Sequence, residues 1–330
     1  MELFTDSLSI NILLFLLGLY ILSKSSDKFV DASVFIAEFF HISEIVIGLT
    51  LVSIGTSLPE LATNIYSSLS GSSGIAIGNA VGSNITNILL ALGLIVLIKD
   101  FPISKTIFHR DGLMMAAVFT VFAGFIYMIG DTLPRWSGFL LVAWCASYIY
   151  FLVKHADSTP PLHEEEEKEK GSFFTIDSMP KALLWLLATV FLISFGAKMM
   201  VDNIVWAAEK FSIPKSIISA TIIAIGTSLP EVAVSFAGLK KSKPDIVIGN
   251  IIGSCIFNIL LVMGLTIAIK PMPIDTETST FLIPFMLLSG ALTVVFMRMK
   301  WMLKRWHGVV FTLLYLTFLT INVLKIINNG

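Results

Sequence analysis

Two glutamates, Glu60 and Glu231, occur within otherwise uncharged apolar stretches of the chain. An ionised side chain in the hydrocarbon of a membrane costs at least about 2.5–3.5 kcal/mol on insertion scales, so such a carboxylate needs a partner. No lysine or arginine lies near either glutamate in the sequence. A transported cation would supply the missing charge, and a protonated glutamate hydrogen-bonded between helices is the structural alternative.

Each glutamate ends a copy of the heptapeptide Ile-Gly-Thr-Ser-Leu-Pro-Glu, at 54–60 and at 225–231. The proline of each copy lacks the amide proton that would bond the carbonyl of the glycine four residues earlier, and its ring pushes that carbonyl away. We therefore expect broken helices in which the carbonyls near Thr56 and Thr227 turn toward a cavity, because non-helical backbone is tolerated at membrane depth only there. A plain proline kink is the simpler interpretation of either proline alone.

Hydroxyl and amide side chains share a helix face with these groups. Ser57 and Ser228 stand three residues before the glutamates, which places hydroxyl and carboxylate on one face. In the following apolar stretch of each copy a serine and an asparagine stand four residues apart: Ser83 with Asn87, and Ser254 with Asn258. These oxygens are hard donors that suit Na⁺ and Ca²⁺, whereas zinc and copper favour His and Cys. The five histidines lie instead in loops or at the ends of apolar stretches.

The two heptapeptides belong to an internal repeat. A shift of 171 residues superposes 46–94 on 217–265 without a gap, with 23 of the 49 pairs identical. Chance repetition of apolar residues would match leucines and isoleucines, but many identities here fall on Gly, Thr, Ser, Pro, Glu and Asn. Corresponding stretches are separated by five predicted spans, an odd number, so the copies should cross the membrane in opposite directions. Such inverted repeats are a frequent plan of secondary transporters, with the site near the membrane midplane.

The composition indicates a polytopic membrane protein, because 55% of the 330 residues are hydrophobic and only 14% are charged. A bilayer core of roughly 30 Å needs about 20 apolar residues per helix. That rule predicts ten spans: 8–37, 44–69, 74–98, 112–130, 136–153, 181–209, 215–239, 244–269, 278–297 and 307–326. The first stretch has no basic residue before it, so we expect a spanning helix there and no signal peptide.

The predicted organisation is a first five-helix repeat over 1–153, an acidic linker over 154–180 and a second five-helix repeat over 181–330. Charged runs such as the one in the linker are typical of solvated, disordered segments. Between spans, one side carries fourteen Lys and Arg and the other side five. The positive-inside rule then predicts a multi-pass protein of the cell membrane with both termini outside and the linker in the cytoplasm.

Other classes find less support. The net charge of −1 offers no basic surface for nucleic acid, and two cysteines in apolar runs form no disulfide framework. No motif of an intramembrane enzyme occurs, so we predict a protein without cofactor or catalytic residues, whose partners are its transported ions and the lipid bilayer; no protein partner is implied. A cation channel could also use carbonyl and carboxylate oxygens. Two inverted copies in one chain, however, build a single enclosed site more naturally than an open pore.

The repeated motifs resemble those of a known family. Two copies of Gly-Thr-Ser-Leu-Pro-Glu, each followed by Gly-Asn-x-x-Gly-Ser-x-x-x-Asn, are similar to the α-repeats of the Ca²⁺/cation antiporter superfamily, and most similar to its prokaryotic Na⁺/Ca²⁺ exchangers. The resemblance implies an all-α fold of ten transmembrane helices in two inverted repeats. It also implies no large regulatory domain, since only a short linker stands where eukaryotic exchangers carry one.

The resemblance further implies ion sites. Glu60 and Glu231 would form a shared Ca²⁺ site with the backbone carbonyls of the two threonines, and the same groups would serve Na⁺. The flanking Na⁺ sites and the centre would be lined by Ser57, Ser83, Ser228, Ser254, Asn87 and Asn258. Members that depend on K⁺ are similar to some prokaryotic members in carrying Asp where Asn258 stands, which argues against K⁺ co-transport.

Charge counting agrees with exchange of three Na⁺ for one Ca²⁺. Two ionised carboxylates neutralise one Ca²⁺, whereas three Na⁺ leave the site at +1, so the exchange should be electrogenic. The alternative within carriers is an H⁺/Ca²⁺ exchanger that uses the two glutamates as proton sites. H⁺-coupled members carry Gly-Asn-x-x-Glu where this chain has Gly-Thr-Ser-x-Pro-Glu, which favours Na⁺.

Overall fold

The computed structural model describes residues 8–70, 73–155, 176–210 and 224–329. The elements of the first repeat are α1 (Leu8–Phe40), α2 (Glu44–Ile47), η1 (Gly48–Val52), α3 (Ser53–Thr56), α4 (Leu58–Leu69), α5 (Ser73–Thr86), η2 (Asn87–Leu92), α6 (Gly93–Ile98), η3 (Ile107–Gly112), α7 (Leu113–Ile129) and α8 (Arg135–Lys154). Those of the second repeat are α9 (Met179–Lys210), α11 (Ala224–Thr227), α12 (Leu229–Lys240), α13 (Pro244–Phe257), η5 (Asn258–Met263), α14 (Gly264–Ile269), η6 (Thr278–Leu282), α15 (Ile283–Arg298) and α16 (Arg305–Asn329). The elements marked η are π-helical stretches that continue into α-helices.

The prediction of an all-helical membrane protein is confirmed. Within the described residues, eight helices are long and apolar enough to span a bilayer, and the bent pair Glu44–Thr56 and Leu58–Leu69 makes a ninth candidate if the two helices cross as one span. The expected span 215–239 is described only from Ala224 onward, and the acidic run 163–170 of the predicted linker lies outside the described residues. Helix α8 ends at Lys154 and α9 begins at Met179, close to the predicted limits of the linker.

Spans 74–98 and 244–269 form the centre of the molecule. In an apolar 18-residue stretch of each of these spans, 78% and 94% of the residues are buried, compared with 28% in α1. Because a lipid-facing helix leaves one face uncovered, these fractions separate the inner spans from the outer ones. The inner spans carry the second halves of the repeated sequence, so the polar repeat residues are enclosed by protein on all sides.

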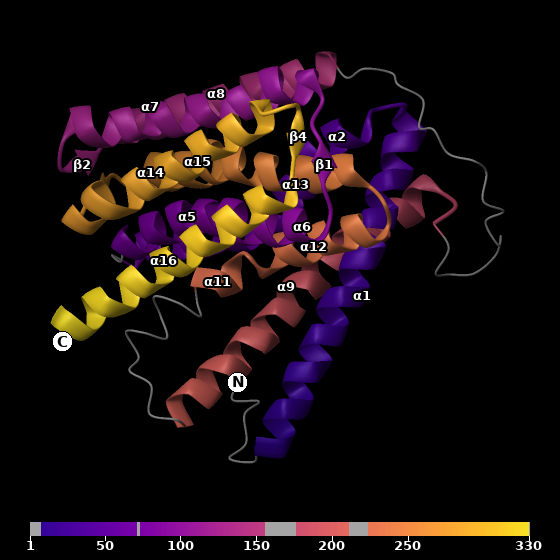
Figure 1. Cartoon of the computed structure of the whole chain (residues 1–330), viewed down its shortest axis with the longest axis horizontal. Helices are drawn as coiled ribbons and strands as arrows, with labels where there is room; N and C mark the ends of the chain where they lie inside the picture. The colour runs from indigo at the N-terminus through magenta and orange to yellow at the C-terminus, as the bar shows by residue number, and fades with distance from the viewer. Residues whose placement is uncertain (1–7, 71–72, 156–175, 211–223, 330) are drawn as a thin grey trace.

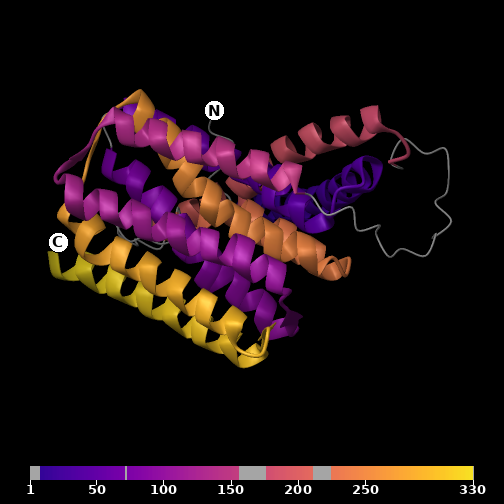
Figure 2. The same ribbon diagram turned by 90° about the horizontal axis from the view of Figure 1, so that it is seen from above.

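Helices α1 and α9 form a pair that lies apart from the remaining spans. They run side by side and are inclined to the other helices (Figure 1 and Figure 2). Their backbones approach closely where glycines meet, because a Cβ added at Gly196 would lie 2.9 Å from the Gly18 carbonyl and 2.8 Å from the Leu22 amide. The pair rests on α12 and on the stretch from α2 to α3 through apolar side chains such as Phe29, Val52 and Val234.

Two short antiparallel ladders join the repeats outside the helices. β1 (Phe101–Pro102) pairs with β4 (Met302–Leu303), and β2 (Thr132–Leu133) pairs with β3 (Met272–Pro273). In the first ladder Phe101 lies opposite Leu303, and in the second Leu133 lies opposite Met272. All four of these side chains are buried. Each ladder therefore fastens a loop of one repeat to a non-corresponding loop of the other, and the repeat relates one ladder to the other ladder.

Candidate ion-binding site

The repeated heptapeptide breaks its helix at the serine. Ser57 has φ −88° and ψ 5°, and Ser228 has φ −89° and ψ 0°, so both residues leave the α-helical region. Helices α4 and α12 begin at the next residue, with the proline as their second residue. The first break bends the span by 42°. The predicted broken helices are confirmed. The nearly equal angles show that the two copies break in the same way.

The break brings the two motifs face to face. The hydroxyl of Ser57 donates to Glu231 Oε1 at 3.1 Å, which links the first motif directly to the second. Glu60 and Glu231 are both fully buried. Both carboxylate oxygens of Glu60 and Oε2 of Glu231 have no hydrogen-bond partner among the described residues. No described lysine or arginine forms an ion pair with either glutamate.

The two threonines anchor the same cluster in matching ways. Thr56 Oγ1 donates to Asn250 Oδ1 at 3.1 Å and lies 3.4 Å from Ser254 Oγ. Thr227 Oγ1 donates to an asparagine of the other repeat at 3.0 Å and lies 3.4 Å from Ser83 Oγ. The threonine of each motif thus contacts the serine of the opposite repeat. These contacts fix both threonines between the two repeats.

Asn79 and Asn250 cross-link the broken helices. Asn79 donates to Asn64 Oδ1 at 2.8 Å while accepting from Thr227. Asn250 donates to the Glu231 carbonyl at 3.2 Å and to Ser235 Oγ at 3.0 Å. The partners Asn64 in α4 and Ser235 in α12 were not among the residues predicted from the sequence. Their spacing could have indicated them, because each stands four residues after its glutamate and therefore on the same helix face.

Asn87 and Asn258 are fully buried and stand at the first residue of η2 and η5. Asn258 donates to Asn84 Oδ1 at 3.2 Å, and its own Oδ1 has no partner among the described residues. Neither Oδ1 nor Nδ2 of Asn87 has a hydrogen-bond partner among the described residues. Single turns of π-helix inside α-helices occur frequently at functional sites, because they turn a side chain out of the regular ladder. Both inner spans use this device at the same repeat position.

The remaining serine, Ser228, is also fully buried, and its hydroxyl has no partner among the described residues. Contacts between the repeats therefore join Ser57 with Glu231, Thr56 with Ser254 and Thr227 with Ser83. The side chains of the other four predicted site residues are fully buried but make no described contact with those of these six: Glu60, Ser228, Asn87 and Asn258. The described residues hold no group of three or more His, Cys, Asp or Glu side chains. The donor set is therefore two carboxylates supplemented by neutral hydroxyl, amide and carbonyl oxygens, which suits exchangeable Na⁺ and Ca²⁺ because the affinity of such sites follows their charge count.

Close helix packing explains part of the glycine content of the repeat. A Cβ added at Gly249 would lie 2.9 Å from the Cα of Gly48, and one at Gly253 would meet the Ser53 side chain and lie 2.8 Å from the Leu49 carbonyl. The backbones of α13 and η1 can approach only because both positions lack a side chain.

Comparison with known proteins agrees with this geometry. The profile of the sodium/calcium exchanger protein family matches residues 10–154 and 181–324. The chain is 33% identical to the sodium/calcium exchanger MaX1 of Methanosarcina acetivorans, over 95% of this chain and 99% of that protein. It is 38% identical to the inner membrane protein YrbG of Escherichia coli, over 79% of this chain and 81% of that protein.

Solved structures show the same fold. A structure of the sodium-calcium exchanger NCX_Mj superposes with a TM-score of 0.79 at 31% sequence identity, covering 94% of this chain and 98% of that chain. The two matched segments of the family profile coincide with the two repeats that the sequence predicts. The chain is therefore a multi-pass membrane protein and an antiporter of the sodium/calcium exchanger family.

Proposed function

We propose that this antiporter exchanges three Na⁺ for one Ca²⁺ by alternating access through a single buried site. The observation that carries the proposal is the pair of fully buried glutamates, one from each repeat, whose remaining oxygens find no partner among the described residues. Leaving such groups buried is costly unless a cation pairs with them. One Ca²⁺ balances both charges, whereas Na⁺ ions must divide among several neutral oxygens.

We assign different roles to the charged and the neutral residues of the site. Glu60 and Glu231 would hold Ca²⁺ together with the carbonyls of Thr56 and Thr227, and would serve Na⁺ in turn. The serines would complete flanking Na⁺ positions, with the amides at the centre: Ser57, Ser83, Ser228, Ser254, Asn87 and Asn258. Because the ions share the carboxylates, bound Na⁺ and bound Ca²⁺ exclude each other. That competition couples the two fluxes.

Alternating access would follow from movement of the α1 and α9 pair across the remaining spans. The pair packs tightly within itself and contacts the site elements through apolar side chains, among them Phe29, which would lie 3.1 Å from a Cβ at Gly55. Apart from the ion pairs of Asp27 and Asp31 with Lys240 and Lys241 at the end of α12, the described contacts of this surface are apolar. A mainly apolar surface would allow sliding once these exposed pairs separate. The proposed setting is the cell membrane, with both termini outside and the linker in the cytoplasm, as the distribution of Lys and Arg favours.

The test is ⁴⁵Ca²⁺ uptake into proteoliposomes preloaded with Na⁺, compared with vesicles preloaded with K⁺ or choline. We expect uptake only from the Na⁺-loaded vesicles. Clamping the membrane potential should change the rate, because one net charge moves and gains about 2.3 kcal/mol per 100 mV. Equal uptake in all three vesicle types would contradict Na⁺ coupling, and a rate independent of potential would contradict the 3:1 ratio. Uptake driven by a pH gradient without Na⁺ would favour H⁺ exchange.

A further inference from the structure

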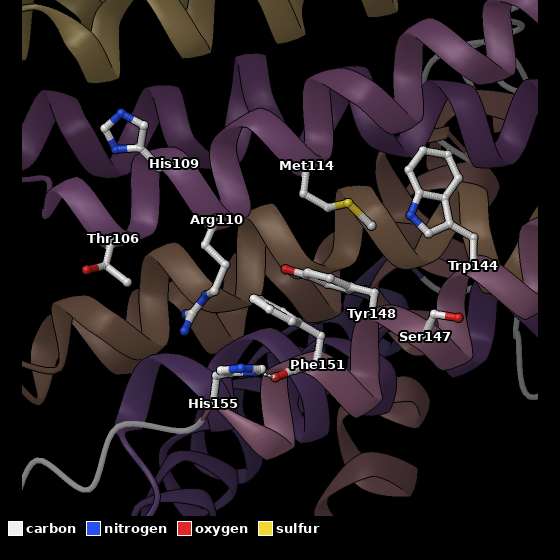
Figure 3. Close-up of a pocket in the computed structure, with 9 residues that line it drawn as sticks. All are labelled: Thr106, His109, Arg110, Met114, Trp144, Ser147, Tyr148, Phe151 and His155. Atoms are coloured by element: carbon white, nitrogen blue, oxygen red, sulfur yellow. Dashed lines mark hydrogen bonds between the residues drawn. The ribbon is translucent and has the colours of Figure 1, made fainter.

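A cavity unrelated to the ion site lies between η3, the start of α7 and the end of α8 (Figure 3). Its volume is about 660 Å³, within the range of ligand-binding pockets. One end carries Thr106, His109, Arg110 and His155, where these helices begin or end. The other end, further along both helices, carries Met114 and Trp144. The cavity is therefore polar at the membrane surface and apolar toward the membrane interior.

A buried ion pair forms the wall at the polar end. Arg110 Nε and Nη2 donate to the two carboxylate oxygens of Asp111 at 2.8 and 3.0 Å, and the Tyr148 hydroxyl donates to Asp111 Oδ1 at 3.0 Å. The Asp111 side chain is fully buried and that of Arg110 is 11% exposed. Buried ion pairs are costly to desolvate, and apolar side chains of similar volume are often as stable.

The second repeat shows that the fold does not need this ion pair. With the shift of 171 residues, Arg110 and Asp111 correspond to Phe281 and Leu282. The sequence Arg-Trp-x-Gly that starts both α8 and α16 sets a shift of 170 there, which matches Tyr148 to Phe318. Phe281 stacks on Phe318 with ring centroids 5.6 Å apart and planes 3° from parallel.

Aromatic rings thus fill the position in the second repeat that corresponds to the cavity. Phe285, the counterpart of Met114, completes the filling at 5.2 Å from the ring of Phe318. The first repeat instead keeps a cavity and a charged pair where apolar packing is available to the same architecture. A charged group retained at a cost inside a membrane span indicates a function, and here the function is distinct from the ion site.

The geometry points to a binding site for one anionic phospholipid, and we propose that the phosphate binds at Arg110 and His155 while an acyl chain lies along Met114 and Trp144. A guanidinium has five N–H donors in a planar fork and can hold a carboxylate and a phosphate together. The carboxylate at this end is that of Asp111, which is paired with Arg110 behind the cavity surface, and the nine described residues that line the surface itself carry no carboxylate. Basic pockets between spanning helices on the cytoplasmic side bind anionic headgroups in this way, and the choice of leaflet rests on the proposed orientation.

The test is native mass spectrometry of the purified protein titrated with phosphatidylglycerol or phosphatidylcholine of equal chain length. We expect wild type to prefer phosphatidylglycerol about tenfold, the effect of one charge-assisted contact. The variant Arg110→Phe/Asp111→Leu/Tyr148→Phe copies the second repeat, so it should lose the preference while keeping its unfolding temperature. A matched control, Lys325→Ala, changes the cation that corresponds to His155 in the second repeat and should keep the preference.

His155 is exposed, so His155→Ala tests the site even if the triple variant does not fold. We expect it to lower the preference about threefold, as for partly exposed charge contacts. Equal binding of both lipids by wild type would overturn the proposal. So would a preference that survives in the triple variant, or in the histidine variant where the triple variant does not fold. Displacement of phosphatidylglycerol by equimolar glycerol phosphate would also overturn it, because the site would then recognise a free anion.

Discussion

The two repeats agree closely at the ion site and differ at the edges of the molecule. At the site, Thr56 bonds Asn250 and Thr227 bonds Asn79 at 3.1 and 3.0 Å, so the threonine contacts of the two repeats are counterparts. At the edges, a polar cavity in the first repeat corresponds to stacked phenylalanines in the second. The contrast indicates two different constraints. The shared site must serve both sides of the membrane equally, whereas the outer surfaces are free to distinguish the two sides.

The contacts of α1 and α9 show the same contrast. Asp27 and Asp31 on α1 pair with Lys240 and Lys241 at the end of α12, at 3.0 and 2.7 Å. The corresponding residues of α9 are Lys198 and Asp202, which pair with each other at 2.8 Å. The two aspartates of α1 therefore anchor the end of α12 across a helix interface. The aspartate of α9 instead pairs with a lysine of its own helix.

The largest effect should come from breaking the symmetry at the carboxylates. Glu60→Gln and Glu231→Gln each remove one of the two charges that balance Ca²⁺. Removing one partner of a buried charge pair costs about 3–5 kcal/mol, so ⁴⁵Ca²⁺ uptake should fall at least about a hundredfold in either variant. Ser57→Ala is the matched comparison, since it removes a hydrogen bond to Glu231 and a proposed Na⁺ ligand but no charge, and should therefore lower uptake less than either glutamine variant. Near-normal uptake by either glutamine variant would refute the shared site.

Candidate residues for the site could be chosen from the sequence because the repeat marks them twice. Identical Glu, Ser and Asn side chains at matched positions in apolar stretches, such as Glu60 with Glu231, cannot arise from hydrophobic patterning alone. The proline at the helix break gave the local geometry. Both breaks occur at the serine with almost the same φ and ψ, as expected from identical local sequences.

Contacts between the repeats could not be predicted in the same way. The bond from Ser57 to Glu231 depends on how two distant segments dock, and no local pattern encodes that pairing. The π-helical starts at Asn87 and Asn258 also depend on packing, because an ordinary α-helix satisfies the same sequence. The strand ladders escaped prediction for another reason. Each strand has only two residues, too few to show an alternating pattern.

A smaller effect is expected at the two cross-linking asparagines. Asn250 makes three hydrogen bonds to Thr56, Ser235 and the Glu231 carbonyl, whereas Asn79 makes two. Each buried group left without a partner costs about 1–3 kcal/mol. Asn250→Ala should therefore lower the unfolding temperature more than Asn79→Ala, measured in detergent at fixed Na⁺. Equal shifts would show that the two repeats are energetically equivalent at this level despite the extra bond.

The smallest effect should come from the ion pairs that hold α1 to α12. Exposed pairs contribute about 0–1 kcal/mol each, so Lys240→Ala/Lys241→Ala should change the balance between the two conformations of the carrier by only about two- to fivefold. Since these pairs connect the α1 and α9 pair to the site helices on one side of the membrane, the KM for Ca²⁺ should change in opposite directions on the two faces. Lys198→Ala breaks a pair within α9 and is the control that should leave both KM values unchanged. Inside-out and right-side-out vesicles give the two values.

Equal changes on both faces would show that the lysines act on ion attraction and not on the conformational balance. High salt would then abolish the difference from wild type, because screening removes attraction by exposed charges.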